Sequence, residues 1–131
     1  MLSFCSRSFA KLFTKTHEWI DLNGTSGTIG ISKHAEHLLG EISIIDVKTG
    51  KTFKTGQEFG EIESAKATSP ILCPMTGKIV SINPKIEADP TIVNKSPESD
   101  GWIARITVDD PNDTKHLMNE DSYKEFLKNA K

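Results

Sequence analysis

Residues 56–77 read GQEFGEIESAKATSPILCPMTG, and a single lysine, Lys66, stands between two runs that favour β-strands. These runs cover residues 58–63 and 67–73 and are bounded by glycine and proline. Ala65 and Ala67 remove bulk on both sides of Lys66, so the tip of a hairpin here would leave the amine accessible. The stretch therefore predicts a β-hairpin that presents Lys66.

The residues around Lys66 favour a modified lysine over a catalytic one. A solvated lysine is protonated at neutral pH, and the nearest charged neighbours, Glu61 and Glu63, stabilise the ammonium form. A lysine that is accessible but not activated suits enzymatic acylation better than Schiff-base chemistry. From these residues alone, however, an ordinary solvated loop lysine is the favoured interpretation, and a modified lysine is the alternative.

The rest of the body follows a pattern of short strands and brief helices. Asn23-Gly24 predicts a tight turn between strands in residues 17–22 and 28–31. Ser32 and Gly40 predict the start and the end of a short helix. Further predicted elements are strands over 42–47, 78–82 and 102–108, a short helix from Asp89-Pro90 through Val93, and a C-terminal helix capped by Asn119. The fold class is mainly β, a small sandwich or barrel with a short internal helix and a C-terminal helix.

Composition excludes several function classes. The chain has 131 residues, with 16 Lys+Arg against 18 Asp+Glu, so the basic excess of a nucleic-acid binder is missing. No apolar run approaches the roughly 18 residues of a transmembrane helix. Two cysteines, Cys5 and Cys73, are too few for a disulfide scaffold. We expect one monomeric domain, with no nucleic-acid or membrane partner.

The first 13 residues, MLSFCSRSFAKLF, differ from the body. They contain Arg7, Lys11 and three serines but no acid, which is typical of organellar transit peptides. We therefore predict a targeting leader over residues 1–13 and a functional domain over residues 14–131. The leader resembles the short presequences of hydrogenosomes, and a disordered N-terminus is the alternative.

An ordered set of motifs resembles the H-protein family of the glycine cleavage system. The central motif is ESAKATS at residues 63–69. The others, in chain order, are TKTHEW at 14–19, GTIGIS at 27–32, LGEI at 39–42, IVNKSP at 92–97 and DGWI at 100–103. The resemblance implies a barrel-sandwich hybrid, the lipoyl-domain fold, extended by helices.

The resemblance also implies a function and its residues. Lys66 would carry lipoate in an amide bond, and Glu63 and Gly77 match positions that lipoylating enzymes are thought to read. Thr16 and Glu18 match positions that help to hold the loaded arm. The chain would be a carrier without catalytic residues of its own.

The implied partners define the cycle that such a carrier serves. It would take an aminomethyl group from glycine decarboxylase, a pyridoxal-phosphate enzyme, to an aminomethyltransferase. It would then pass electrons to dihydrolipoamide dehydrogenase. The expected location is the mitochondrial matrix or a mitochondrion-related organelle such as a hydrogenosome.

Two positions depart from the family pattern. Pro70 stands where many members have an acid, and Leu38 stands where some have a histidine, with His37 beside it. The alternative function is therefore an H-like lipoyl carrier that serves lipoyl relay or other redox clients without full glycine cleavage.

Other classes of site have weaker support from the sequence. A biotin carrier would show Met on both sides of its lysine, where this chain has Ala65 and Ala67. A metal-dependent hydrolase could use His34 and His37, but zinc sites need three or four ligands, so we expect surface histidines and no metal. We expect Cys73 to be a small core residue. The acids at 58, 61 and 63 are expected to form a solvated face.

Overall fold

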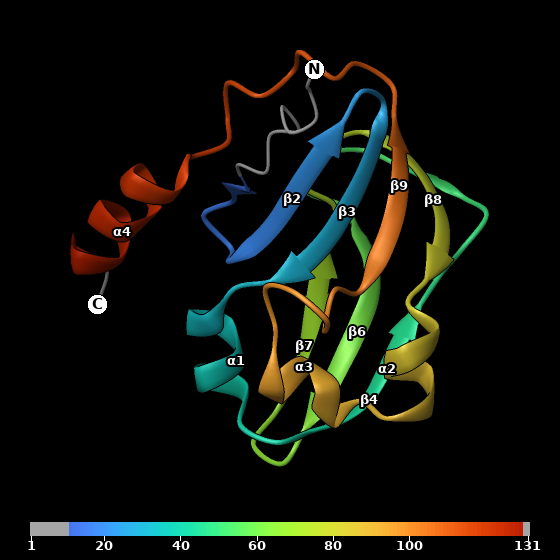
Figure 1. Ribbon diagram of the computed structural model, residues 1–131, viewed down its shortest axis with the longest axis vertical. Coiled ribbons are helices and arrows are strands. Elements are labelled where there is room, and N and C mark those ends of the chain that lie inside the picture. The colour runs from blue at the N-terminus through green and yellow to red at the C-terminus, as the bar shows by residue number, and fades with distance from the viewer. Residues whose placement is uncertain (1–10, 130–131) are drawn as a thin grey trace, which may run out of the picture.

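Two antiparallel sheets face each other across one hydrophobic core (Figure 1). The computed structural model describes residues 11–129. One sheet has the strand order β1-β2-β3-β9-β8-β5 and the other has the order β4-β6-β7. The strands are β1 Leu12–Phe13, β2 Glu18–Asn23, β3 Ser26–Ile31, β4 Ile42–Val47, β5 Thr52–Phe53, β6 Glu58–Ser64, β7 Thr68–Leu72, β8 Gly77–Ile82 and β9 Ala104–Val108. The predicted β-fold is confirmed, as a sandwich and not as a closed barrel.

The predicted first hairpin and first helix are both present. Gly24 takes a φ of +65° in the turn between β2 and β3. Helix α1, Lys33–Leu39, begins after Ser32, whose hydroxyl accepts a hydrogen bond from the Ala35 N–H at 3.2 Å. It ends at Gly40, where φ is +75° and the N–H donates to the Glu36 carbonyl. Local capping therefore fixes where β4 starts.

Three further helices complete the structure. The predicted helix after Asp89 is α3, Thr91–Lys95, and the predicted C-terminal helix is α4, Glu120–Asn129. Asn119 caps α4 as expected, because its side-chain oxygen accepts from the Ser122 N–H. Helix α2, Pro84–Ala88, was not predicted, although Asn83 caps it and Pro84 occupies its first turn. The two-residue strands β1 and β5 were also missed, because so short a run carries no periodicity.

A second, aromatic cluster joins the two ends of the described chain. Phe13 and Tyr123 stack with ring centroids 4.4 Å apart, and both side chains are buried with Trp19. Phe13 also exchanges two backbone hydrogen bonds with Met118. Leu12 and Phe13 fall inside the predicted leader range 1–13 but belong to the sheet. Lys11 is also described, while residues 1–10 of that range lie outside the described residues.

Substituting Phe13 tests whether β1 belongs to the folded domain. We expect Phe13→Ala to lower the free energy of unfolding by about 3 kcal/mol or more, because a stacked, buried aromatic ring is lost. Urea-induced unfolding measures the change. Lys11→Ala is the control, since its ammonium contacts the Trp19 ring at 5.1 Å and its loss should cost about 1 kcal/mol or less. Equal losses for the two variants would contradict the placement of Phe13 in the core.

Candidate functional site

Lys66 lies in the exposed turn between β6 and β7, as predicted. Glu63 pairs with Thr68 at the last step of the ladder. Within the turn, the Ser64 hydroxyl accepts hydrogen bonds from the backbone N–H groups of Lys66 and Ala67, at 3.3 and 3.2 Å. The turn is therefore held by its own backbone and by Ser64, while the Lys66 side chain takes no part in holding it.

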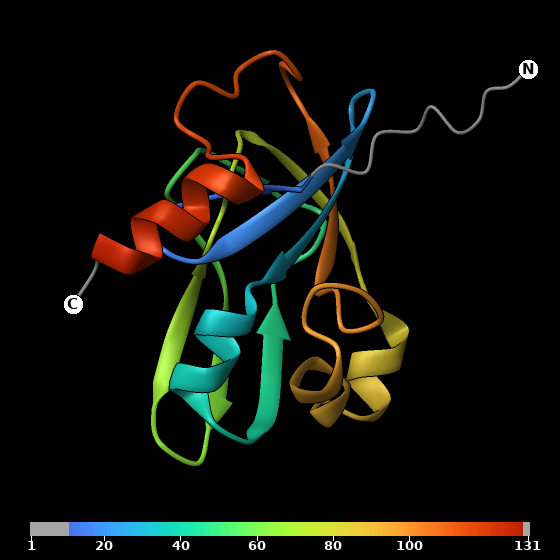
Figure 2. The same cartoon turned by 60° about the vertical axis from the view of Figure 1, so that its left-hand side comes forward.

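The β6–β7 turn also packs against the connection between α1 and β4 (Figure 2). The Ala65 N–H donates to the Glu41 carbonyl at 3.0 Å. The Lys66 side chain lies over Gly40, with its Cε 3.4 Å from the position that a Cβ of Gly40 would take. A side chain at Gly40 would press on Lys66, so this glycine leaves room for the lysine stem.

Glu63 and Gly77 occupy different parts of the molecule. Glu63 is exposed on β6, three residues before Lys66. Gly77 begins β8 in the other sheet, at the opposite end of the sandwich from the β6–β7 turn (Figure 1). A Cβ at Gly77 would collide with the Thr107 carbonyl oxygen on β9. The structure therefore does not bring Gly77 beside Lys66, and it gives Gly77 a structural reason to be glycine.

Because Gly77 is closely packed and Glu63 is exposed, substitutions at the two positions are expected to change the stability of the protein by different amounts. Gly77→Ala should lower the free energy of unfolding by about 1–3 kcal/mol, because β8 and β9 must separate to admit a methyl group. Glu63→Gln should change it by no more than about 0.5 kcal/mol, because the carboxylate is exposed. Urea unfolding distinguishes them. If both variants are as stable as the parent chain, the close packing at Gly77 is wrong.

Glu18 is a buried carboxylate and not a solvated strand acid. Its side chain accepts hydrogen bonds from the hydroxyls of Thr14, at 2.8 Å, and Thr16, and from the Leu72 N–H at 3.1 Å. The residue is 3% exposed. Burial raises the pKa of Glu18, and the hydrogen bonds from Thr16, Leu72 and Thr14 oppose that rise. The structure thus brings Thr16 and Glu18 together, and their contact with a loaded arm stays a prediction.

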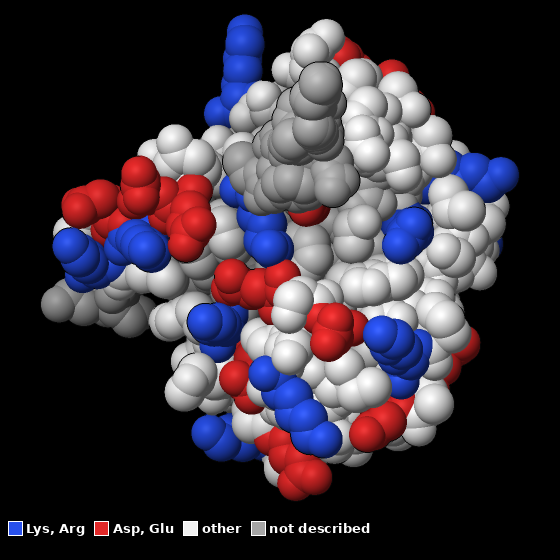
Figure 3. Space-filling view, viewed as in Figure 1, with Lys and Arg blue, Asp and Glu red and all other residues white. Residues whose placement is uncertain are grey.

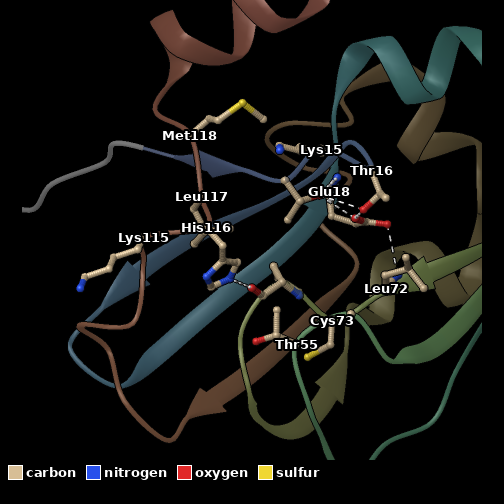
Figure 4. Close-up of a pocket in the computed structure, with 13 residues that line it drawn as sticks. Lys15, Thr16, Glu18, Thr55, Leu72, Cys73, Lys115, His116, Leu117 and Met118 are labelled. Atoms are coloured by element: carbon tan, nitrogen blue, oxygen red, sulfur yellow. Dashed lines mark hydrogen bonds between the residues drawn. The ribbon is translucent and has the colours of Figure 1, made fainter. Parts of the chain in front are cut away.

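A pocket of about 430 Å³ opens beside Glu18 (Figure 4). Its walls come from four separate segments, residues 14–18, 55–56, 72–74 and 115–118. His116 donates from Nε2 to the Pro74 carbonyl at 2.7 Å, which ties the last segment to the connection that follows β7. No sequence pattern marked residues 115–118 for this position, because their contacts are made with distant parts of the chain.

Cys73 lines the same pocket but is not a reactive thiol. Its Sγ donates to the Met75 carbonyl, and the residue is 1% exposed. Burial raises the pKa of the Cys73 thiol to about 11. The thiolate is the nucleophile in disulfide exchange, so Cys73 stays inert at neutral pH. The prediction that Cys73 is a core residue is confirmed.

Strand β7 joins the two parts of the candidate site. Lys66 precedes it and Leu72, which binds Glu18, ends it. The four strand steps from Thr68 to Leu72, at about 3.3 Å each, span roughly 13 Å, and Lys66 lies in the turn beyond them. Pro70 is exposed midway along the strand. The amine of Lys66 and the buried carboxylate of Glu18 are therefore two separate sites, and only a long arm attached to the lysine could reach from one to the other.

The remaining candidates do not form a metal site in the described part of the chain. His34 lies beside His17, with ring centroids 4.6 Å apart, while His37 is exposed. Between residues 11 and 129, no three His, Cys, Asp or Glu side chains come together as metal ligands. The acids at 58, 61 and 63 are exposed, as predicted for a solvated face.

Two further observations concern the distribution of charged side chains on the surface and the length of the helices. Figure 3 shows basic and acidic side chains interspersed on one face, without a continuous basic stripe. No helix in the described part of the chain is both long and apolar enough to cross a membrane.

Comparisons with known proteins agree with the motifs. The profile described as "Glycine cleavage H-protein" matches residues 11–130. A glycine cleavage system H protein from Psychromonas ingrahamii is 43% identical, over 87% of this chain and 93% of the relative. A mitochondrial one from Arabidopsis thaliana is 34% identical, over 95% of this chain and 85% of the relative. The crystal structure of a glycine cleavage system H protein from Mycobacterium marinum superposes with a TM-score of 0.82 at 26% identity, covering 92% and 98% of the two chains. The chain therefore belongs to the glycine cleavage H-protein family.

Proposed function

We propose that this protein is the lipoyl carrier of a glycine cleavage system, with the lipoyl group on Lys66. The observation that carries the proposal is the exposed Lys66 at the tip of a hairpin whose turn is held by Ser64 and by the hydrogen bond from Ala65 to Glu41. Bound lipoate supplies a dithiolane that accepts the aminomethyl group and electrons. The chain's own residues attach, present and shelter that arm.

Attachment depends on an amine that a lipoylating enzyme can reach. Ala65, Lys66 and Ala67 are all exposed, so small side chains flank the amine on both sides. Glu63 is exposed on the same hairpin and is the acid that such an enzyme is proposed to read. Gly77 is assigned the same role from family resemblance, although its packing against β9 accounts for it as well.

Shelter of the loaded arm is assigned to Glu18 and Thr16. A carboxylate offers about four lone-pair sites, and Glu18 receives three side-chain and backbone donors, from Thr14, Thr16 and Leu72. One site remains for the ammonium of an aminomethyl cargo, and its positive charge would neutralise the buried carboxylate. The Thr16 hydroxyl is already bound to Glu18, so Thr16 would orient the carboxylate. Pro70 has no charge to add to this interaction.

The chemical steps belong to the partners. The glycine decarboxylase loads the arm, the aminomethyltransferase unloads it, and dihydrolipoamide dehydrogenase reoxidises the dithiol. The buried Cys73 thiol does not compete for the arm's disulfide, which supports a carrier without a catalytic residue of its own. Tethering the arm to the protein raises its effective concentration at each partner to the order of millimolar.

The proposed location is the mitochondrial matrix or a mitochondrion-related organelle. The basic, acid-free composition of residues 1–10 supports it. Related H proteins are named as mitochondrial in Arabidopsis thaliana and occur without that label in bacteria such as Thermotoga maritima. Because Leu12 and Phe13 belong to β1, we propose that leader removal ends before Leu12.

Carbon exchange between glycine and bicarbonate tests the function. The lipoylated chain, with a competent glycine decarboxylase, should support exchange, and the unlipoylated chain should not. Lipoylated protein should also be reduced by NADH and dihydrolipoamide dehydrogenase. Reduction without any exchange would overturn glycine cleavage in favour of the relay or redox-client alternative.

A further inference from the structure

Helix α3 is tied to the connection between α1 and β4 by one side chain, Asn94 (Figure 1). The Asn94 side-chain oxygen accepts a hydrogen bond from the Ile42 N–H at 2.9 Å. Its side-chain amide donates to the Gly40 carbonyl at 2.8 Å and to the Glu36 carboxylate at 2.7 Å. Two of these three bonds therefore fall on the residues immediately before and after Glu41.

One planar peptide unit links Asn94 to the tip of the β6–β7 hairpin. This unit contains the Glu41 carbonyl and the Ile42 N–H, which point in opposite directions because the peptide bond is trans. Asn94 accepts from the N–H on one side, and the Ala65 N–H donates to the carbonyl on the other side at 3.0 Å. A hydrogen-bonded N–H also polarises its carbonyl and makes it a stronger acceptor. Asn94 therefore both directs and strengthens the acceptor that binds Ala65.

The hairpin tip depends on this contact because the sheet supports it incompletely. Strand β7 is an edge strand of its sheet, and the ladder between β4 and β6 has a register shift between Ile42 and Ile44, next to the tip. The Lys66 stem rests on Gly40, the second backbone group that Asn94 binds, with its Cε 3.4 Å from the position that a Cβ of Gly40 would take. Asn94 thus acts on two contacts between the hairpin tip and the α1–β4 connection.

We propose that Asn94 is a positioning residue for the lipoylation of Lys66, because it fixes the hairpin tip in the conformation that the lipoylating enzyme binds. This inference rests on the proposed function and adds to it a residue from outside the hairpin. In the reaction, the neutral Lys66 amine attacks the carbonyl carbon of an acyl-adenylate, the amide C–N bond forms, and the C–O bond to the AMP phosphate breaks. AMP leaves with the bonding electron pair, and the lysine gives up two protons to solvent, one before the attack and one after it. Asn94 takes no part in these bond changes and acts only through the backbone.

Lipoylation kinetics of the unmodified full chain, measured with a lipoate–protein ligase, lipoate and ATP, test the proposal. A tip that is held in place about one tenth of the time binds the enzyme about tenfold more weakly. Asn94→Ala should therefore raise the KM for the protein substrate about tenfold and leave kcat unchanged. Asn119→Ala is the matched control and should keep the parent KM, because it also removes an asparagine that binds a backbone N–H, that of Ser122 on α4.

A charge swap between Asn94 and Glu36 tests the same link without removing side-chain volume. Asn94→Asp alone places two carboxylates against each other, so their repulsion should draw the new oxygen away from the Ile42 N–H and raise the KM. Adding Glu36→Gln restores a hydrogen bond between the two positions with donor and acceptor exchanged, because the glutamine amide donates to the carboxylate. The double variant should therefore recover the parent KM.

Amide hydrogen exchange at Ala65 shows whether the effect passes through Glu41. The Ala65 N–H is bonded to the Glu41 carbonyl, so its exchange should be about tenfold faster in Asn94→Ala and unchanged in Asn119→Ala. The proposal requires a raised KM and faster exchange together, and either change without the other, or neither, would overturn it. A parent chain that gains no lipoyl mass would overturn the proposed function, and this inference with it, whereas a lipoylated parent with unaffected Asn94 variants overturns this inference alone.

Discussion

Lys66→Arg is expected to abolish lipoylation completely while leaving the fold unchanged. Arginine keeps the positive charge, and its stem can still lie over Gly40, where the lysine carbons pack at 3.4–3.7 Å. The guanidinium stays protonated under all ordinary conditions, so it offers no free amine for acylation. Intact-mass spectrometry of protein made in lipoate-producing cells should show a lipoyl increment in the parent chain and none in the variant.

The matched control changes another exposed lysine. Lys78→Arg lies on β8, in the other sheet, and should keep the full increment. Urea unfolding should place both variants within about 0.5 kcal/mol of the parent chain, because neither side chain is buried. A lipoyl increment that survives in Lys66→Arg would show that the arm sits on another lysine, and the assignment of the hairpin as the carrier site would be wrong.

The features that the sequence predicted well are those fixed within a few residues. Asn23-Gly24, Ser32, Gly40 and Asn119 act on their own backbone or on residues up to four positions away, so local rules found the turn, the helix ends and the cap. Lys66 was also found locally, since a lysine between two alanines at a strand junction needs no distant contact to be exposed. The motif resemblance then linked this lysine to Thr16 and Glu18.

The features that local reasoning missed depend on distant contacts. Glu18 is buried because the Leu72 N–H, 54 positions away, reaches its carboxylate and because residues 115–118 cover the pocket. From its own neighbours, an acid in an alternating strand is expected to be solvated. Likewise, β1 is stable as a strand because Met118 and Tyr123 pack and pair with Phe13. Such contacts leave no signal within one element.

Glu18→Gln is expected to remove the loss of stability that the parent chain shows as the pH rises, while its amide NH2, which cannot accept a hydrogen bond, lowers stability by a constant amount at every pH. Burial raises the pKa of Glu18 above its ordinary value of 4.5. The folded state then binds the proton more tightly than the unfolded state, so the free energy of unfolding falls as pH rises from 4.5 through the raised pKa. Glutamine does not ionise, so it removes this loss. Urea unfolding between pH 4 and 8 should show the difference between the chains growing with pH and then levelling off.

The same substitution should shorten the lifetime of the loaded arm. A hydrogen bond to a charged group is worth about 1.5–3 kcal/mol, so an ammonium that loses the Glu18 carboxylate should escape about tenfold faster or more. Release of formaldehyde from the loaded carrier, measured without the aminomethyltransferase, follows this loss, and Glu63→Gln serves as an exposed-carboxylate control. A variant with an unchanged release rate would mean that Glu18 serves the packing of Thr14, Thr16 and Leu72 alone. A variant that loses the pH dependence of its stability and also releases its cargo early would explain why a buried carboxylate is kept, because its ionisation cost is then offset by the cargo's charge only when the arm is loaded.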